Sequence, residues 1–197
     1  MTRLPGRGIL VTTSLCAAGY VTDRGNAAVS VFDTAGECQM HWSSKKTGQG
    51  TLSRPGAISL AKDGSLFVSE HLCSRVSKFN ADGSWALTWG SEGRDEGMFR
   101  EVGVIRLVVD GTVWVGDIYN CGAQYSKLSG EYLSQIYLPA GHPTDFMLDA
   151  QEHPSWSMAF NKSSVALITT ETVSSISASA AVALGQSNSM STAGCGL

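Results

Sequence analysis

Short runs in which hydrophobic and polar residues alternate recur along most of the chain, and turns that contain glycine separate them. In the clearest stretch four such runs lie at 57–61, 66–69, 75–79 and 85–89. The first alternates around Ile58 and Leu60, and Asp63 with Gly64 separates it from the second. Alternation with a period of two predicts half-buried β-strands. Asp-Gly between two runs predicts a hairpin turn, because glycine accepts a positive φ. We therefore expect a four-stranded antiparallel sheet here.

The same plan returns at a shift of 47 residues. Asp23, Glu70 and Asp117 are separated by 47 residues each. The same offset relates Gly36 to Gly83 and Gly130, Tyr20 to Phe67 and Trp114, Val21 to Val68 and Val115, Trp42 to Trp89, and Gly56 to Gly103. So many matches in one register, without a gap, indicate an internal repeat. Four-stranded repeats of about 40 to 50 residues are typical of propeller blades, which bury their faces by stacking on their neighbours.

The sequence thus predicts an all-β fold, an incomplete β-propeller of three to four blades followed by a tail. The expected propeller covers residues 1–157, with blades at about 5–46, 47–93 and 94–138 and a partial one at 139–157. Residues 158–197 are rich in Ser and Ala, and we expect a low-complexity tail there, in which 165–176 is also compatible with an added strand.

Composition narrows the class of protein further. Charged residues make up 16% of the chain, with 14 basic and 17 acidic side chains, so a strongly basic nucleic-acid binder is excluded. The hydrophobic share of 43% is enough for a core. No run of apolar residues is long enough to cross a membrane, so we expect a soluble protein. The N-terminal run 9–18 resembles a weak signal peptide, but the repeat explains it better, and the compartment stays unknown.

The cysteines form no metal-binding pattern. There are five, at Cys16, Cys38, Cys73, Cys121 and Cys195, and no two have the C-x-x-C spacing of zinc or redox motifs. We expect free or buried thiols, and a Cys73–Cys121 disulfide is the alternative.

Several segments resemble the NHL repeat. Residues 54–58 read Arg-Pro-Gly-Ala-Ile, 67–70 read Phe-Val-Ser-Glu, and 75–79 read Arg-Val-Ser-Lys-Phe. Asp-Gly turns stand at 63–64 and 82–83, where the repeat has Asp-x-x-Gly. The resemblance covers roughly residues 5–150. It implies an NHL-type propeller, a fold that usually has six blades, so this chain is expected to be an open arc, a fragment, or a chain that self-associates through open blade edges.

Within that family most members are non-catalytic platforms that bind proteins or RNA, and one branch contains the peptidyl-α-hydroxyglycine α-amidating lyases. The loop around Cys73, Ser74 and Arg75 resembles the lyase loop. However, Gly56 and Gly103 stand where that branch places metal-binding histidines. We therefore expect a platform for a protein or peptide partner, without a cofactor.

Two alternatives stay open. The first is a partial or degenerate metal-dependent lyase, with Arg75 as its catalytic residue, His142 as a metal ligand and zinc or calcium as the metal. The second is an RNA-binding platform, although the chain has few basic residues to support it.

Candidate contact residues lie where the loops between second and third strands meet the linkers between blades. In a propeller these segments share one face, which predicts a ligand-binding face that includes Arg24, Asn26, Glu70, His71, Arg75, Asp117, Tyr119 and Asn120. The acids at 23, 70 and 117 are also suited to accept hydrogen bonds from backbone N–H groups of their loops. Arg75 is expected to pair with an acid. His71 and Tyr119 differ between repeats, so they are the better candidates for specific contacts.

Overall fold

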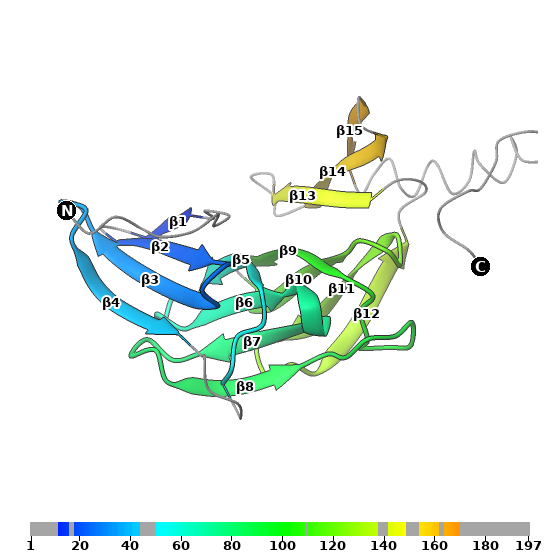
Figure 1. Cartoon of the computed structure of the whole chain (residues 1–197). Helices are drawn as coiled ribbons and strands as arrows, with labels where there is room; N and C mark the ends of the chain where they lie inside the picture. Colours follow the sequence, from blue (N-terminus) through cyan, green and yellow to red (C-terminus); the bar gives the residue numbers. More distant parts are fainter. Residues whose placement is uncertain are drawn as a thin grey trace, which may run out of the picture.

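The structure is a computed structural model, and it consists almost wholly of antiparallel β-sheets (Figure 1). It describes residues 12–15, 18–43, 50–108, 110–137, 142–148, 154–161 and 164–169. The first sheet contains β1 (Thr12–Leu15), β2 (Ala18–Asp23), β3 (Ala28–Asp33) and β4 (Cys38–Ser43). The second contains β5 (Pro55–Leu60), β6 (Leu66–Glu70), β7 (Arg75–Phe79) and β8 (Trp85–Trp89). The third contains β9 (Val102–Leu107), β10 (Thr112–Asp117), β11 (Gly122–Lys127) and β12 (Tyr132–Tyr137).

A fourth sheet has three strands among the described residues, β13 (His142–Leu148), β14 (Pro154–Asn161) and β15 (Ser164–Thr169). The boundary expected at 157 therefore falls inside β14. The strand considered near 165 is present as β15, within the segment expected to be a tail. Residues 170–197 lie outside the described part of the chain.

The sheets stack face to face in sequence order (Figure 1). Within each sheet, strands follow one another as neighbours, and the first strand of one sheet packs against the first strand of the next, as β5 does with β9 and β9 with β13. This is the arrangement of propeller blades, so the predicted all-β fold of a partial propeller is confirmed.

The aromatic and aliphatic columns of the repeat form the core between sheets. Phe67 is fully buried against the third sheet, where Ile105, Val113 and Val115 pack with it. Between the first two sheets the core contains Val29, Leu52, Ile58, Leu66, Val68 and Phe79. Burial of each such side chain contributes about 1.5–3 kcal/mol. The inter-sheet contacts are therefore a main source of stability, and they explain why the apolar positions repeat.

Among the repeated columns of residues with positive φ, two have a member in each of the first three sheets. Gly36, Gly83 and Gly130 close the hairpins between third and fourth strands with φ of 81°, 80° and 83°. The second column is not glycine: Ala27, Ser74 and Cys121, again 47 apart, have φ of 51°, 48° and 51°. They end the loop before the third strand of each sheet. The backbone repeats there although the side chains do not.

The cysteine expectations are corrected by the structure. Cys38 and Cys73 are free, whereas Cys121 is disulfide-bonded. Its partner lies outside the described residues, so the alternative Cys73–Cys121 bridge is wrong, and so is a free thiol at Cys121.

Among the described residues the one helical element is the three-residue η1 (His71–Cys73), and none there is long and apolar enough to cross a membrane.

Candidate functional site

The loops between second and third strands lie together with the linkers that lead into each sheet. Because neighbouring strands are antiparallel, the end of the second strand meets the start of the first. Pro55 pairs with Glu70 at this edge of the second sheet, and Val102 pairs with Asp117 in the third. We call the surface made by loops 24–27, 71–74 and 118–121 and linkers 50–54 and 97–101 the loop face.

Asp23 organises the loop of the first sheet. Its Oδ1 accepts hydrogen bonds from the backbone N–H groups of Gly25 and Asn26, each at 2.9 Å, and the Asn26 side-chain amide donates to Oδ2 at 2.6 Å. Burial would raise the pKa of Asp23, but the hydrogen bonds from Asn26 and Gly25 outweigh it, so the pKa is lowered. Asn26 is thus used in holding its own loop.

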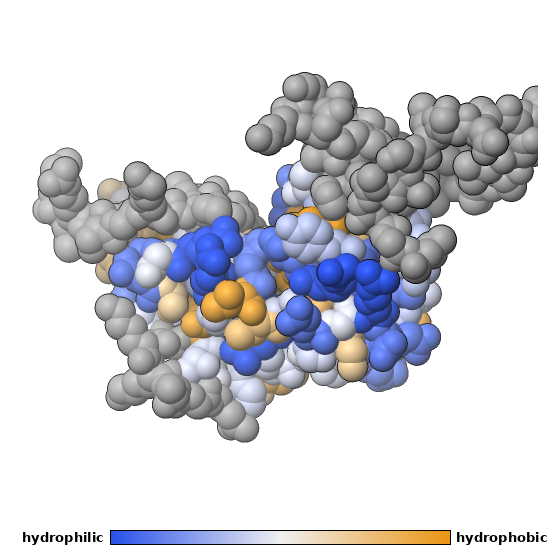
Figure 2. Space-filling model, turned by 45° about the vertical axis from the view of Figure 1, so that its right-hand side comes forward, coloured by the Kyte–Doolittle hydropathy of each residue, from blue (hydrophilic) through white to orange (hydrophobic). Residues whose placement is uncertain are grey.

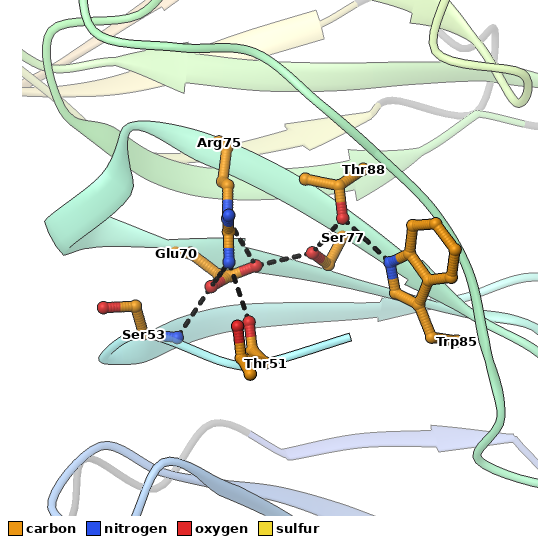
Figure 3. Close-up of polar contacts among 7 residues, drawn as sticks. All are labelled: Thr51, Ser53, Glu70, Arg75, Ser77, Trp85 and Thr88. Carbon is orange, nitrogen blue, oxygen red and sulfur yellow. Dashed lines mark hydrogen bonds and ion pairs between the residues drawn. The ribbon is translucent and has the colours of Figure 1, made fainter. Parts of the chain in front are cut away.

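Glu70 is the most enclosed acid of the column, with no exposed side-chain surface. Its carboxylate accepts from the backbone N–H of Ser53 at 2.6 Å and from the hydroxyl of Ser77 at 2.5 Å. Ser77 lies at hydrogen-bond distance from Thr88, which accepts from the indole N–H of Trp85 (Figure 3). The network connects the linker before β5 to the outermost strand β8.

Arg75 pairs with Glu70 through two parallel hydrogen bonds. Its Nε lies 3.1 Å from Oε1 and one terminal nitrogen 3.0 Å from Oε2, and the same nitrogen donates to the carbonyl of Thr51 at 2.7 Å (Figure 3). Burial alone would lower the pKa of Arg75, but the hydrogen bond and charge of Glu70 outweigh it and raise the pKa. The expected pairing of Arg75 with an acid is present in this geometry, and most of the guanidinium is occupied by it.

Asp117 repeats the linker contact in the third sheet. Its Oδ1 accepts from the backbone N–H groups of Arg100 at 3.0 Å and Glu101 at 3.4 Å, and Asn120 donates to Oδ2 at 2.6 Å. Burial raises the pKa of Asp117, and the hydrogen bonds offset it only in part. Arg100 is 47 residues after Ser53, so two sheets use the same bond from linker to acid.

His71 occupies a different environment from the acids. Its imidazole lies directly over Gly56, where a Cβ would come within 2.0 Å of Nε2. Its Nδ1 is 3.5 Å from Oε1 of Glu101, an ion-pair distance longer than a usual hydrogen bond. Burial lowers the pKa of His71, and the charge of Arg24 adds to that effect while Glu101 opposes it. The imidazole is therefore neutral at pH 7.

Two apolar side chains are exposed on the loop face. Leu72 is 64% exposed and Tyr119 is 48% exposed. Figure 2, which brings the right-hand side of Figure 1 forward, shows hydrophobic surface bordered by hydrophilic surface in the middle of the described part. Arg54 and Arg100, in the two linkers, are exposed as well.

The structure thus places the expected residues unevenly. It brings Glu70 and Arg75 into one network and Asp117 and Asn120 into another, while His71 lies between sheets. For His142 only the backbone is described, at the start of β13, so its suggested metal role lies outside the described side chains. Sequence reasoning placed Arg54 on this face but missed Leu72 and Glu101; the signal that could have found Glu101 is its position 47 residues after Arg54.

Within the side chains that the structure describes, no three His, Cys, Asp or Glu residues gather as metal ligands would.

Comparisons with known proteins give a fold but no family. No family model and no curated protein matches the sequence. Solved structures do match: a catalytically inactive H270A virginiamycin B lyase from Staphylococcus aureus with quinupristin has a TM-score of 0.62 at 14% identity, over 84% of this chain and 57% of that one. A streptogramin B lyase structure has a TM-score of 0.61 at 14% identity, over 81% of this chain and 53% of that one.

The WD40 β-propeller domain of Doa1 matches with a TM-score of 0.58 at 12% identity, over 78% of this chain and 46% of that one. The chain therefore spans about half the length of the solved structures it matches. Because these include both lyases and a WD40 propeller, the likeness shows a propeller-type fold and leaves the activity open.

Proposed function

We propose that this chain is a non-catalytic, NHL-type propeller segment whose loop face binds a protein or peptide partner. The observation that carries the proposal is that some side chains of that face hold the structure together while others are left exposed to solvent. Glu70 and Asp117 accept hydrogen bonds from the linkers, whereas Leu72 and Tyr119 are exposed. No resident metal or cofactor forms part of this role.

The exposed groups have the chemistry of a binding surface for polypeptides. Interfaces between proteins are enriched in tyrosine and arginine, and buried aromatic and arginine anchors in them contribute most of the affinity. The loop face offers Tyr119 and Leu72 together with the exposed cations Arg54 and Arg100. The loops that carry the anchors are held by buried hydrogen bonds, so little ordering cost is left for binding.

Selection of peptides on the immobilised chain tests this proposal, and the chain supplies matched controls. Leu72→Asp and Tyr119→Asp change the loop face, while Leu133→Asp and Tyr137→Asp change residues that are 38% and 67% exposed on β12. We expect the loop-face variants to bind selected peptides at least about tenfold more weakly, a change of about 1.4 kcal/mol. The β12 variants should bind as the original chain does. Equal losses in both pairs, or no retained peptide, would contradict the proposal.

A metal-dependent lyase is the second candidate, and a neutral imidazole beside a carboxylate favours it. His71 next to Glu101 has the make-up of a general base with a positioning partner. Arg75, with zinc or calcium and His142, belongs to this candidate. Its test is release of glyoxylate from a hydroxyglycine peptide together with the zinc and calcium content of the purified chain. Binding of RNA that falls steeply with salt would favour the RNA alternative instead.

A further inference from the structure

Side chains from three consecutive sheets meet around His71. Arg24 follows β2 of the first sheet, Arg54 precedes β5 and His71 follows β6 of the second, and Glu101 precedes β9 of the third. Their proximity follows from the contacts at Gly56. The Thr22 hydroxyl, two residues before Arg24, donates to the Gly56 carbonyl at 2.7 Å.

The imidazole is held at this junction on two further sides. It covers Gly56, and its own backbone N–H lies 3.4 Å from the carbonyl of Arg54. Glu101 lies 3.5 Å from Nδ1. The charges of Arg24 and Arg54 lower the pKa of His71 and the Glu101 carboxylate raises it, so two cations and one anion act on the imidazole, an excess of one positive charge.

Two nitrogens at this junction are buried without a hydrogen-bond partner among the described residues. They are Nε of Arg24 and Nδ1 of His71. A buried donor without a partner costs about 1–3 kcal/mol, more for a charged group, and such groups are rare in native structures. Nε of a guanidinium always carries a proton, and none of the described residues supplies an acceptor for it at Arg24.

The backbone of Arg54 is also unusual. Its φ is +50°, and Glu101, at the equivalent position one repeat later, is not among the described residues with positive φ. The other non-glycine residues of this kind, Ala27, Ser74 and Cys121, form a repeated column, so they serve the fold. The left-handed region costs a non-glycine residue about 1–2 kcal/mol. Such strain at a position whose equivalent in the next described repeat lacks it is typical of ligand sites.

We propose that Arg24, Arg54 and His71 form a binding site for a carboxylate, supplied by an Asp or Glu side chain of the peptide partner. This inference rests on the proposed function and names what the loop face selects. A carboxylate would supply the acceptor that Arg24 lacks, and guanidinium groups bind carboxylates through paired, charge-assisted hydrogen bonds. A local excess of one positive charge matches a single carboxylate, whereas nucleic acids require many basic contacts.

Acetate is the first probe, with the NMR titration of His71 as the readout. An anion beside the imidazole favours its protonated form, so acetate at constant ionic strength should raise the pKa of His71 saturably. Arg24→Gln and Arg54→Gln should abolish the shift. Lys127→Gln removes an equal charge from the end of β11 that lies away from the loop face, so it should leave the shift intact. The resonances of His41, in β4, report whether each variant folds.

No movement of the His71 pKa with acetate would overturn the site. A response to inorganic phosphate but not to acetate would overturn the choice of a carboxylate. A shift that persists in Arg24→Gln and Arg54→Gln would overturn the assignment of residues.

Selected peptides are the second probe, and they separate this inference from the proposed function. Replacing each Glu or Asp of a bound peptide by Gln or Asn should weaken binding at least tenfold at one position, and Arg24→Gln should remove that difference. Peptides that depend on Leu72 but ignore the acid replacement would overturn the inference and leave the proposed function standing. If no peptide is retained, the proposed function fails, and the acetate titration alone decides whether the site binds carboxylates.

Discussion

Glu70 should be the most sensitive polar residue of the second sheet. Glu70→Gln removes the negative charge that pairs with Arg75. It also replaces one carboxylate oxygen, which accepts hydrogen bonds, by an amide NH₂ group, which cannot accept from the N–H groups of Arg75 and Ser53. Glu70 is fully buried, whereas the Arg75 side chain is 28% exposed, so water compensates the arginine in part. Removing one partner of a buried ion pair costs about 3–5 kcal/mol, and the partial exposure places the expected loss of stability near the lower end, at about 3 kcal/mol.

Urea unfolding followed by tryptophan fluorescence measures this loss, because Trp85 belongs to the same network. Arg75→Gln and the double variant complete a mutant cycle, in which we expect a coupling of about 1.5 kcal/mol or more. The matched control is Glu131→Gln, whose partner Lys127 and own side chain are 53% and 60% exposed, so its cost should stay below about 1 kcal/mol. If Glu70→Gln costs no more than this control, or the cycle shows no coupling, the carboxylate does not hold the linker as described.

Three further predictions concern the loop face and the turns. Gly56→Ala should expel the imidazole of His71, since the new Cβ would come within 2.0 Å of Nε2, and NMR titration should show the His71 pKa rising toward its ordinary value of 6.5. Because the folded-state pKa of His71 is lowered, its contribution to stability is present above pH 6.5 and is lost as pH falls through the folded pKa. Between those two pKa values the free energy of unfolding in urea should therefore fall less for His71→Gln than for the original chain. Gly130→Ala, at φ +83° and 3.0 Å from Trp89, should lower the melting temperature more than Gly111→Ala, at φ +87° with nothing within 4 Å.

Each of these has an outcome that would contradict it. An unchanged pKa in Gly56→Ala would mean that the imidazole does not occupy the space over residue 56. Identical profiles of stability against pH for His71→Gln and the original chain would mean that burial does not lower the pKa of His71. Equal melting temperatures for Gly130→Ala and Gly111→Ala would mean that φ alone, about 1–2 kcal/mol, sets the cost at both turns.

The fold was accessible from the sequence because the same physical demand recurs every 47 residues. A strand between two sheets needs an apolar side chain at a fixed register, and a hairpin needs glycine at a positive φ. Phe67 is the buried apolar side chain of such a strand, and Gly83 is the glycine with positive φ of such a hairpin. Positions where the backbone alone repeats, such as Ser74 and Cys121, carry no common side chain. That column could be found only in three dimensions.

The site was less accessible because its contacts join residues of different repeats. The acids were expected to accept from backbone N–H groups of their own loops; Asp23 does so, whereas Glu70 accepts from Ser53 in the linker before β5. The approach of His71 to Glu101 depends on how far one sheet is rotated against the next, and no spacing in the sequence encodes that angle. Burial of the Arg24 Nε likewise follows from packing between sheets.

The second sheet fixes its loop by other means than its neighbours. In the first and third sheets an asparagine, Asn26 or Asn120, reaches back to the acid of the column. The second sheet has Cys73 at the equivalent position, and Arg75 on β7 holds Glu70 instead. Positions 71–73 are thereby released from holding the acid. Substitutions at Leu72 and Cys73 can therefore change what the surface recognises while Arg75 still holds Glu70, so these two positions are where variants of the protein can acquire new specificity.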